Sequence, residues 1–322
     1  MQATDLYFSV KDDFTAVDAA IVEHLSSQVP MVEKISQYII ESGGKRLRPL
    51  LVLLSARACG YQQSQHIQLA AVVEFIHTAT LLHDDVVDTS DLRRGKPTAN
   101  NKWGNSSSVL VGDFLYSRAF QMLVAIGHLD VMGTLSNATN VIAEGEVLQL
   151  LNAKNPDVSE ADYLHVILGK TAMLFEAASH TGAQLAQANG QQIQALQRFG
   201  RHLGIAFQLI DDLMDYTGDQ ANMGKNVGDD LAEGKPTLPL IHAMAHSTYA
   251  ERKLIRKAIR QGSCEKIDDI NAILNRCRSL DYTHAKASQE TRDALACLAV
   301  LKDSPYKQSL ADLCTLALTR QN

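Results

Sequence analysis

Apolar residues recur at three- and four-residue spacing through most of this chain of 322 residues. This spacing puts the apolar side chains on one face of an α-helix, whereas a half-buried strand would alternate with a period of two. The chain contains only 7 prolines, and no low-complexity tract or fixed-period repeat interrupts the pattern. The pattern therefore predicts an all-α protein with a large core.

Length and composition give no reason to divide the chain. A chain of 322 residues allows one large domain or two ordinary ones, and no linker rich in proline, serine and glycine separates two parts. The hydrophobic content of 46% exceeds that of disordered chains. We expect residues 1–322 to form a single helical domain.

Four helices are expected in the first part of the chain, over about residues 15–27, 31–41, 48–59 and 65–88. Further helices follow to the C-terminus, and those after about residue 245 carry no recognisable chemistry, so we expect them to be scaffold. Three longer interruptions combine glycine with lysine or arginine, at residues 41–46, 91–105 and 217–237.

Charge and cysteine content limit the possible partners and compartments. The net charge of -6 offers no overall attraction to nucleic acid or to an anionic membrane surface. Five cysteines without a CxxC pair argue against a disulfide framework or a zinc site and indicate a reducing compartment. The N-terminus has no basic segment followed by an apolar one, and no apolar run approaches the roughly 18 residues that cross a bilayer. We expect a cytoplasmic protein with no transmembrane segment and no nucleic-acid partner.

Two aspartate clusters carry the strongest chemical signal. The segment LLHDDVVD ends the long fourth helix with Asp84, Asp85 and Asp88. The segment LIDDLMD repeats the DDxxD pattern with Asp211, Asp212 and Asp215. Residues four apart on a helix point the same way, so the first and last aspartates of each cluster form a pair of carboxylates on one face.

Paired carboxylates of this kind indicate a metal site. They repel one another unless a cation lies between them, and hard oxygen ligands suit magnesium, which shares its coordination shell with waters and substrate phosphates. A calcium-binding EF-hand would need alternating ligands in a loop with a central glycine, whereas these clusters lie in apolar helical segments. A single cluster could be a solvated acidic helix end, but two copies favour magnesium binding.

Magnesium bound to phosphate predicts cationic side chains nearby, and the three interruptions supply most of them. Any one of these residues by itself is more often a solvated surface charge. Gly43 and Gly44 precede a basic turn that could wrap a diphosphate with backbone and side-chain donors. The candidates are Lys45, Arg46, Arg48, Arg93, Arg94, Lys170 with Thr171, Lys225 and Lys235.

Two further side chains lie near the aspartate clusters. His77 precedes Asp84 by seven residues and shares nearly the same helix face, where it could donate a hydrogen bond to a phosphate. Gln208 lies three residues before Asp211. Each could equally be a hydrogen-bonded core residue, and spacing alone leaves both alternatives open.

The chain resembles the trans-isoprenyl diphosphate synthases, or polyprenyl synthetases, and the order and spacing of the motifs agree over nearly its whole length. The segments that carry the resemblance are GGKRLRP, LLHDDVVD with LRRGKPT, GKT, FQLIDDLMD and GKNVGDDLAEGKPTLPLI. The resemblance implies the isoprenoid-synthase fold, a single large helical bundle. In that fold the two aspartate clusters face each other across a central cavity, with three magnesium ions between them.

The resemblance also implies a role for each candidate residue. The metal ligands would be Asp84, Asp88, Asp211 and Asp215, with Asp85 and Asp212 as closer support. The allylic diphosphate would be held by Lys170, Thr171, Gln208, Lys225, Lys235 and Arg93. Lys170 and Lys225 would join the six aspartates in catalysis. The isopentenyl diphosphate would lie against Lys45, Arg48, His77 and Arg94.

The enzyme implied by this resemblance is a magnesium-dependent prenyltransferase that adds isopentenyl diphosphate units to an allylic diphosphate, with farnesyl diphosphate as the expected primer. Metals and lysines would stabilise the charge on the leaving pyrophosphate, and the isopentenyl double bond would attack the allylic cation. No side-chain base stands out, so the proton would go to the departed pyrophosphate. We expect an octaprenyl diphosphate or a product close to it, of the kind used for quinone side chains such as that of ubiquinone.

Small residues before the first aspartate cluster favour a long product. Short-chain relatives carry aromatic rings four and five residues before the position of Asp84, where this chain has Thr80 and Ala79. The growing tail would continue past them toward Ile76, Met122 and Leu123. Small residues could instead only permit close helix packing, and that alternative stays open.

Two other functions fit part of the sequence. A class I terpene cyclase would share the fold and the metals, but would need neither the GGKRLRP pocket nor a second DDxxD at Asp211. A non-catalytic regulatory subunit of a prenyl synthase would typically have lost one aspartate cluster, and both are complete here. Long-chain members of the resembled family are commonly homodimers, so we expect a homodimer.

Overall fold

The structure is a computed structural model that describes residues 6–217 and 228–319. The chain forms two compact units, each assembled from three segments. Unit 1 comprises Met1–Thr139, Leu174–Gly200 and Cys297–Leu313, and unit 2 comprises Asn140–Met173, Arg201–Ala296 and Cys314–Asn322. The expectation of a single domain over residues 1–322 stays a prediction.

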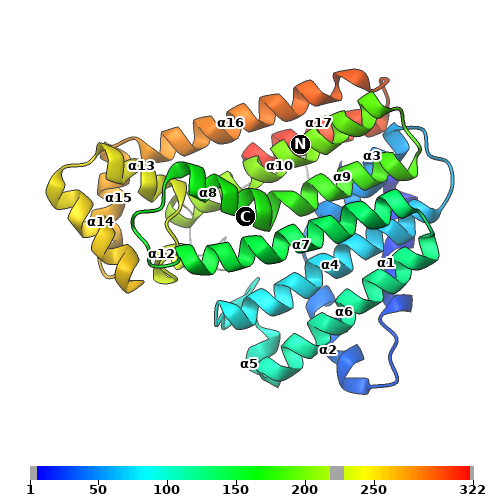
Figure 1. Ribbon diagram of the computed structural model, residues 1–322, viewed down its shortest axis with the longest axis horizontal. Helices are drawn as coiled ribbons and strands as arrows, with labels where there is room; N and C mark the ends of the chain where they lie inside the picture. Colours follow the sequence, from blue (N-terminus) through cyan, green and yellow to red (C-terminus); the bar gives the residue numbers. More distant parts are fainter. Residues whose placement is uncertain (1–5, 218–227, 320–322) are drawn as a thin grey trace. The chain divides into compact units, whose positions relative to one another are not determined.

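Unit 1 consists of helices around one long central helix, α4. Its elements are the 3-10 turn η2 (Phe8–Val10), α1 (Lys11–His24), α2 (Pro30–Glu41), α3 (Leu47–Ala58), α4 (Gln65–Val87), β1 (Leu92–Arg93), β2 (Lys96–Pro97), α5 (Ala99–Trp103), α6 (Asn105–Ile126), the first part of α7 (Leu129–Asn152), most of α9 (Met173–Leu185), the beginning of α10 (Gly190–Thr217), the turn η4 (Leu298–Val300) and most of α17 (Pro305–Thr319). In Figure 1, α4 and α6 run side by side, and α5 adjoins the beginning of α6.

Unit 2 contains the remaining helices. They are the second part of α7, α8 (Glu160–Ile167), the π-helical turn η3 (Leu168–Ala172), most of α10, α12 (Asp229–Ala232), α13 (Leu238–His246), α14 (Tyr249–Gln261), α15 (Ile267–Arg276) and α16 (Ser279–Cys297). Capping boxes at Ser159 and Thr248 satisfy backbone N–H groups where α8 and α14 begin. Figure 1 shows α13, α14 and α15 grouped together, and their buried apolar side chains share one core.

The helical prediction is confirmed. The four predicted helices correspond to α1–α4, and α1 begins and ends a few residues earlier than predicted. Asp12 and Asp13 explain the earlier start, because acidic side chains in the first turn interact favourably with the helix dipole. The helices expected after residue 245 are also present, as α14 to α17.

A two-residue hairpin between α4 and α5 was not predicted. Leu92 pairs with Pro97 and Arg93 with Lys96 in the antiparallel ladder of β1 and β2. The connecting residues, Arg94 and Gly95, both have positive φ, of 52° and 74°. Two consecutive positive φ values match the right-handed twist of a tight hairpin, and Gly95 adopts such a value without steric cost. The hairpin lies within residues 91–105, which the sequence predicts as an interruption between helices.

One expectation from the sequence, that no apolar run is long enough to cross a bilayer, is wrong for α6. The helix has 22 residues and is long and apolar enough to cross a bilayer, whereas the sequence was expected to hold no such run. Val111, Leu115, Ala119 and Leu123 of α6 are buried, and α6 packs against α4. Part of its apolar surface therefore belongs to the core of unit 1, and core helices of globular proteins share this composition.

The surface of α4 divides into a buried part and an accessible face. Phe75, Ile76, Ala79 and Leu82 are completely buried. His83, Val86 and Val87 are accessible on other sides of its last turns, while one accessible face consists of Glu74, His77, Thr80, Leu81, Asp84 and, where the helix ends, Asp88. These positions recur at three- and four-residue spacing, so they lie along one side of the helix. Polar and acidic groups from the sequence prediction therefore share one face.

Candidate functional site

The first aspartate cluster contains one buried and two accessible carboxylates. Asp85 is fully buried, and Arg93 reaches its Oδ1 with Nε at 2.8 Å and Nη2 at 2.7 Å. Asp84 and Asp88 are partly exposed on the accessible face of α4. The structure thus makes Asp85 a core residue and leaves Asp84 and Asp88 able to contact a cation.

The guanidinium of Arg93 is engaged by Asp85, whereas the sequence predicts it at the allylic diphosphate. Arg93 belongs to β1, and the hairpin brings it back toward the end of α4. A charge-assisted contact to a fully buried carboxylate is strong, because without it the charge of Asp85 would be buried without compensation. Arg93 therefore holds the aspartate cluster in place in this structure.

The loop Gly43–Arg46 adopts a conformation that few residues accept. Gly43, Gly44 and Arg46 have φ of 85°, 137° and 43°. Glycine adopts such values freely, but a left-handed conformation at Arg46 costs about 1–2 kcal/mol. Arg46 directly precedes α3, so this turn sets the direction in which the helix begins.

Arg94 lies directly over Gly44. A Cβ atom at Gly44 would be 2.6 Å from Nη1 of Arg94 and 2.7 Å from Nη2, so no other residue fits there without moving the guanidinium. The turn of the hairpin and the loop Gly43–Arg46 therefore meet through this contact. Two segments that the sequence predicts at the isopentenyl diphosphate, the loop and Arg94, lie together in unit 1.

Arg48 and His77 complete this group of side chains. Nη1 of Arg48 lies 3.2 Å from Nε2 of His77, and its guanidinium lies over the ring of Phe175 at 4.4 Å from the centroid. Together with Lys45, Arg46 and Arg94, these two residues form what we call the basic cluster. All members of the basic cluster belong to unit 1.

His77 is a neutral hydrogen-bond donor in this arrangement. Burial lowers the pKa of His77 well below its ordinary value, and the charges of Arg48, Arg94 and Arg93 lower it further. A guanidinium only donates hydrogen bonds, so Nε2 of His77 must accept from Arg48 and the proton lies on Nδ1. His77 therefore retains one N–H that can donate to an anion.

Glu74 lies among the arginines and was missed by the sequence prediction. Burial raises the pKa of Glu74, while the charges of Arg46, Arg48 and Arg94 oppose that rise. Its Oε2 is buried without a hydrogen-bond partner. The signal was present in the sequence, because Glu74 is a single acid in an apolar helical stretch and lies three residues before His77.

The second aspartate cluster, on α10 in unit 2, also separates buried from accessible carboxylates. Asp212 is buried, and it accepts hydrogen bonds from the hydroxyl of Tyr163 at 2.6 Å and from Nε2 of Gln208 at 2.7 Å. Asp211 is partly exposed. Asp212 thus has the supporting position in this cluster that Asp85 has in the first. Tyr163, on α8, carries no motif that would have predicted this contact.

The sequence predicts Asp215 as a metal ligand, whereas in the structure its carboxylate accepts hydrogen bonds from the backbone. Its Oδ1 accepts the backbone N–H of Asp229 at 3.1 Å, and its Oδ2 accepts that of Asp230 at 3.3 Å. Asp215 is buried, and these contacts hold the beginning of α12. Asp211 is therefore the more accessible carboxylate of the second cluster.

Negative charge accumulates around the second cluster. Burial, followed by the charge of Asp230, raises the pKa of Asp215 to about 8 and that of Asp212 to about 7. Shifts of this direction mean that the carboxylates lack compensating positive charge. A divalent cation would supply that charge, so the donor set fits magnesium.

Lys170 and Thr171 lie in the π-helical turn η3, and such turns often occur at functional sites. The hydroxyl of Thr171 donates to Oε1 of Gln208 at 2.9 Å, and Gln208 in turn donates to Asp212. Nζ of Lys170 forms an ion pair with Glu146 at 2.8 Å. The structure therefore links Thr171 through Gln208 to Asp212 of the second cluster, whereas Lys170 pairs with Glu146. Their predicted role at the allylic diphosphate stays a prediction.

Two glycines allow the backbones of α7 and η3 to touch. A Cβ atom at Gly145 would lie 2.7 Å from the backbone nitrogen of Lys170 and 3.0 Å from the carbonyl carbon of Gly169. Backbone atoms in a helix cannot move aside cheaply, so the position of Lys170 depends on Gly145 having no side chain.

Lys235 lies in unit 2, between α12 and α13. Lys235 forms an ion pair with Glu233, and its backbone N–H donates to the carbonyl of Asp230 at 2.8 Å. Lys225, a predicted diphosphate ligand, lies outside the described residues.

Of the residues predicted to set chain length, only Thr80 lies on the accessible face of α4. Its hydroxyl donates to the carbonyl of His77 at 2.8 Å. Ile76 and Ala79 are completely buried, and Met122 and Leu123 of α6 are nearly so. Thr80 is therefore the residue of this set that a substrate near Asp84 would meet first.

In the part of the chain that the structure describes, no three His, Cys, Asp or Glu side chains are grouped to hold a metal ion by themselves. Magnesium is commonly bound by one or two carboxylates together with waters and substrate phosphates, so it requires no such group. The accessible pair Asp84 and Asp88, and Asp211 in unit 2, fit this mode of binding.

Comparison with known proteins adds independent information. A model of one protein family, Polyprenyl synthetase, matches residues 29–277. The octaprenyl diphosphate synthase of Escherichia coli (strain K12) is 52% identical over 309 residues, which cover 96% of this chain and 96% of that enzyme.

Solved structures resemble the chain over its whole length. The crystal structure of a decaprenyl diphosphate synthase from Rhodobacter capsulatus has a TM-score of 0.95 and 47% sequence identity, and covers 100% of both chains. A polyprenyl synthase from Caulobacter crescentus CB15, crystallised with calcium and isoprenyl diphosphate, has a TM-score of 0.96 and 41% identity, and covers 100% of this chain and 98% of that one.

Proposed function

Because the chain belongs to the polyprenyl synthetase family, we propose that it adds successive isopentenyl diphosphate units to an allylic diphosphate and releases a long all-trans-polyprenyl diphosphate. The chain is a prenyltransferase, and farnesyl diphosphate is the proposed primer. The proposed product is octaprenyl diphosphate, the product named for the relative from Escherichia coli, although the similar enzyme from Rhodobacter capsulatus is named for a decaprenyl product.

The observation that carries this proposal is the accessible face of α4. Asp84 and Asp88 share that face with His77, which Arg48 of the basic cluster contacts at 3.2 Å. One side of α4 thus offers carboxylates for a metal, and through His77 it meets the guanidinium of Arg48 on α3, a cationic group for a second diphosphate. An enzyme that joins two diphosphates needs both.

The basic cluster would hold isopentenyl diphosphate. Lys45, Arg48 and Arg94 supply positive charge, and guanidinium groups can bind phosphate oxygens with two parallel hydrogen bonds. His77 would donate through Nδ1, since its Nε2 accepts from Arg48. Neutral His77 adds a donor without adding charge, so the site depends on the arginines for its electrostatics.

The allylic diphosphate would be held through magnesium by Asp84, Asp88 and Asp211, with Lys170, Thr171, Gln208, Lys225 and Lys235 as direct contacts. Bound magnesium, three ions by the resemblance, would neutralise the charge that the leaving pyrophosphate gains. Lys170 would move from Glu146 to the pyrophosphate, because a diphosphate offers more negative charge than one carboxylate. The proton lost from the isopentenyl unit would go to the departed pyrophosphate.

The basic cluster and the two aspartate clusters favour a synthase over the two alternatives. A class I terpene cyclase acts on a single diphosphate and would not need Arg48, His77 and Arg94 gathered as a second anion site. A non-catalytic regulatory subunit would not need two aspartate clusters with supported middle residues, as Asp85 and Asp212 are here. Both features support a catalytic synthase.

We also propose that the enzyme is a cytoplasmic homodimer. Leu110 and Val124 on α6 are each about two-thirds exposed, and exposed apolar residues on one helix mark a surface suited to a second copy. The compartment is proposed from the sequence, because five cysteines without a CxxC pair are typical of a reducing compartment. Sedimentation of the purified protein at twice the chain mass of 35.2 kDa would support the dimer, and sedimentation at that mass would oppose it.

The reaction is tested by incubating the purified protein with magnesium, farnesyl diphosphate and labelled isopentenyl diphosphate and sizing the extracted products by chromatography. We expect a ladder that ends near eight isoprene units, about the octaprenyl length, and its loss when a chelator removes divalent metal. A protein that leaves isopentenyl diphosphate unused with every allylic primer would be a cyclase or a regulatory subunit.

A further inference from the structure

The loop Gly43–Arg46 depends on contacts from elsewhere in unit 1. Three of its four residues have positive φ, and a strained loop persists only where its surroundings hold it. On one side it meets the guanidinium of Arg94, which lies over Gly44. On the other side it meets the N-terminal segment, which consists of η2 and α1 together with Leu6 and Tyr7.

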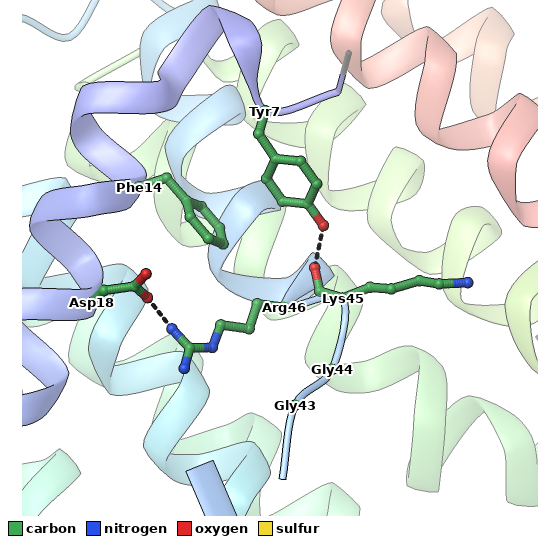
Figure 2. Close-up of a pocket in the computed structure, with 7 residues that line it drawn as sticks. All are labelled: Tyr7, Phe14, Asp18, Gly43, Gly44, Lys45 and Arg46. Carbon is green, nitrogen blue, oxygen red and sulfur yellow. Dashed lines mark hydrogen bonds and ion pairs between the residues drawn. The ribbon is translucent and has the colours of Figure 1, made fainter. Parts of the chain in front are cut away.

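Tyr7 holds the backbone of this loop. Its hydroxyl donates to the carbonyl of Lys45 at 2.5 Å, as Figure 2 shows. The ring of Tyr7 is fixed by an edge-on contact with Phe14, with centroids 4.9 Å apart. Burial raises the pKa of Tyr7, so the hydroxyl keeps its proton and remains a donor at neutral pH.

Asp18 holds the side chain of Arg46. The two form an ion pair between α1 and the left-handed residue of the loop. In Figure 2, Arg46 extends toward Asp18 while Lys45 extends in the opposite direction, away from this contact. The ion pair therefore fixes which of the two neighbouring cations faces α1 and which faces away from it.

The space behind the loop is not filled. An open surface pocket of about 320 Å³ lies between the N-terminal segment and the loop, lined by Tyr7, Phe14, Asp18, Gly43, Gly44, Lys45 and Arg46. Gly43 and Gly44 are therefore not held by close packing where they face this pocket. The contacts of Tyr7 and Asp18, two residues that line this pocket, connect the N-terminal segment to the loop.

From these contacts we infer that the N-terminal segment is a clamp that holds the loop Gly43–Arg46 ready for isopentenyl diphosphate, with Tyr7 and Asp18 as positioning residues. The family match begins only at residue 29, so the clamp lies outside the matched range although it contacts a loop inside it. The inference rests on the proposed function, because that function makes the loop part of the isopentenyl diphosphate site.

A clamp of this kind lowers the cost of binding. A loop that is already in its bound conformation does not have to be ordered by the substrate, so more of the contact energy appears as affinity. Loss of one positioning contact should therefore weaken binding of isopentenyl diphosphate while the allylic site in the same enzyme keeps its affinity.

The kinetic test compares Tyr7→Phe, Asp18→Asn and the double variant with two matched controls. Asp12→Asn changes an exposed aspartate of the same helix, and Tyr249→Phe removes the hydroxyl of a tyrosine that is 82% exposed. Each single clamp variant should raise KM for isopentenyl diphosphate by about 3- to 10-fold, the effect of one lost hydrogen bond or ion pair. KM for farnesyl diphosphate and kcat should stay within about twofold of wild type. Asp18→Glu should recover most of the affinity, because it keeps the charge.

A second readout does not depend on catalysis. Trypsin cleaves after lysine and arginine, so a loosened loop should be cut faster after Lys45 and Arg46 in the clamp variants than in either control, as mass spectrometry of the fragments would show. Equal cleavage of this loop in clamp variants and controls would overturn the clamp. Faster cleavage at every site, or equal rises in both KM values, would also overturn it, because the segment would then only stabilise the fold. A wild-type enzyme without elongation would instead refute the proposed function, and the proteolysis would still decide the clamp.

Discussion

Replacing Gly145 by alanine should destabilise the protein and displace Lys170. The added Cβ would lie 2.7 Å from the backbone nitrogen of Lys170 and 3.0 Å from the carbonyl carbon of Gly169. Neither atom is the end of a flexible side chain, so the backbone of α7 or of η3 has to shift. Overpacking of this kind typically costs about 1–3 kcal/mol.

The same helix provides a matched control. Gly133 also lies in α7, is exposed, and would place a Cβ where no atom lies within 4 Å. Alanine is favoured over glycine within a helix by about 1 kcal/mol, so Gly133→Ala should stabilise by up to that amount. The propensity gain is common to both variants, so Gly145→Ala should be less stable than Gly133→Ala by the overpacking cost, about 1–3 kcal/mol.

Urea unfolding followed by far-ultraviolet circular dichroism gives the stability difference, and steady-state kinetics gives the effect on Lys170. We expect kcat of Gly145→Ala to fall on the order of 10- to 100-fold, because a misplacement of about 1 Å at a substrate contact can cost this much. Gly133→Ala should keep the wild-type rate. If the two variants had the same unfolding midpoint, the close contact between α7 and η3 would not exist as described.

Other substitutions test further parts of the structure. Burial alone would raise the pKa of Asp13, but hydrogen bonds from Arg57 bring the pKa below its ordinary value. This pair therefore stabilises the fold above about pH 4, and its contribution is lost as pH falls through the lowered pKa. Asp13→Asn should therefore lower the free energy of unfolding by about 1–2 kcal/mol at neutral pH and by less in acid, as urea unfolding at both pH values would show. Tyr163→Phe removes a donor from buried Asp212 and should cost about 1–3 kcal/mol in the same assay, whereas an unchanged midpoint would mean that this hydrogen bond contributes nothing. Thr80→Phe should shorten the product seen by chromatography, and an unchanged ladder would remove Thr80 from the path of the growing chain.

Features with a strong local signal were predictable from the sequence. Helices α1 and α2 follow from apolar spacing, because each buries one side and one-sided burial requires that spacing, whereas α3 is buried nearly all round. The accessible face shared by His77 and Asp84 follows from their seven-residue separation. The association of Thr171 and Gln208 with the second cluster was predicted through the family resemblance, and the structure brings both to Asp212.

Contacts between distant segments were not predictable from local spacing. Arg93 contacts Asp85 because a two-residue hairpin returns the chain, and a tight turn at Arg94 and Gly95 has only a weak sequence signal. The hydrogen bonds that the backbone of α12 donates to Asp215 likewise cannot be predicted from the DDxxD pattern. A motif specifies which residues are present, whereas tertiary contacts decide which of them remain accessible.

Two polar residues near the candidate site, Glu74 and Tyr163, show the same limit. Glu74 could be noticed in the sequence as an acid in an apolar helix, but its proximity to Arg46, Arg48 and Arg94 depends on how three separate segments meet. Tyr163 had no signal, since a tyrosine on an amphipathic helix is usually a core residue. These residues support the candidate site without belonging to its motifs.

The most direct test of the account measures incorporation of labelled isopentenyl diphosphate into extractable polyprenyl product, with saturating magnesium and farnesyl diphosphate, for wild type and two variants. Asp84→Asn removes the charge of an accessible carboxylate on α4, and Asp268→Asn removes the charge of an exposed aspartate on α15. The account predicts a long product from wild type and Asp268→Asn, and a rate lower on the order of 100-fold or more for Asp84→Asn. A wild type without incorporation, or an Asp84→Asn variant as fast as wild type, would contradict it.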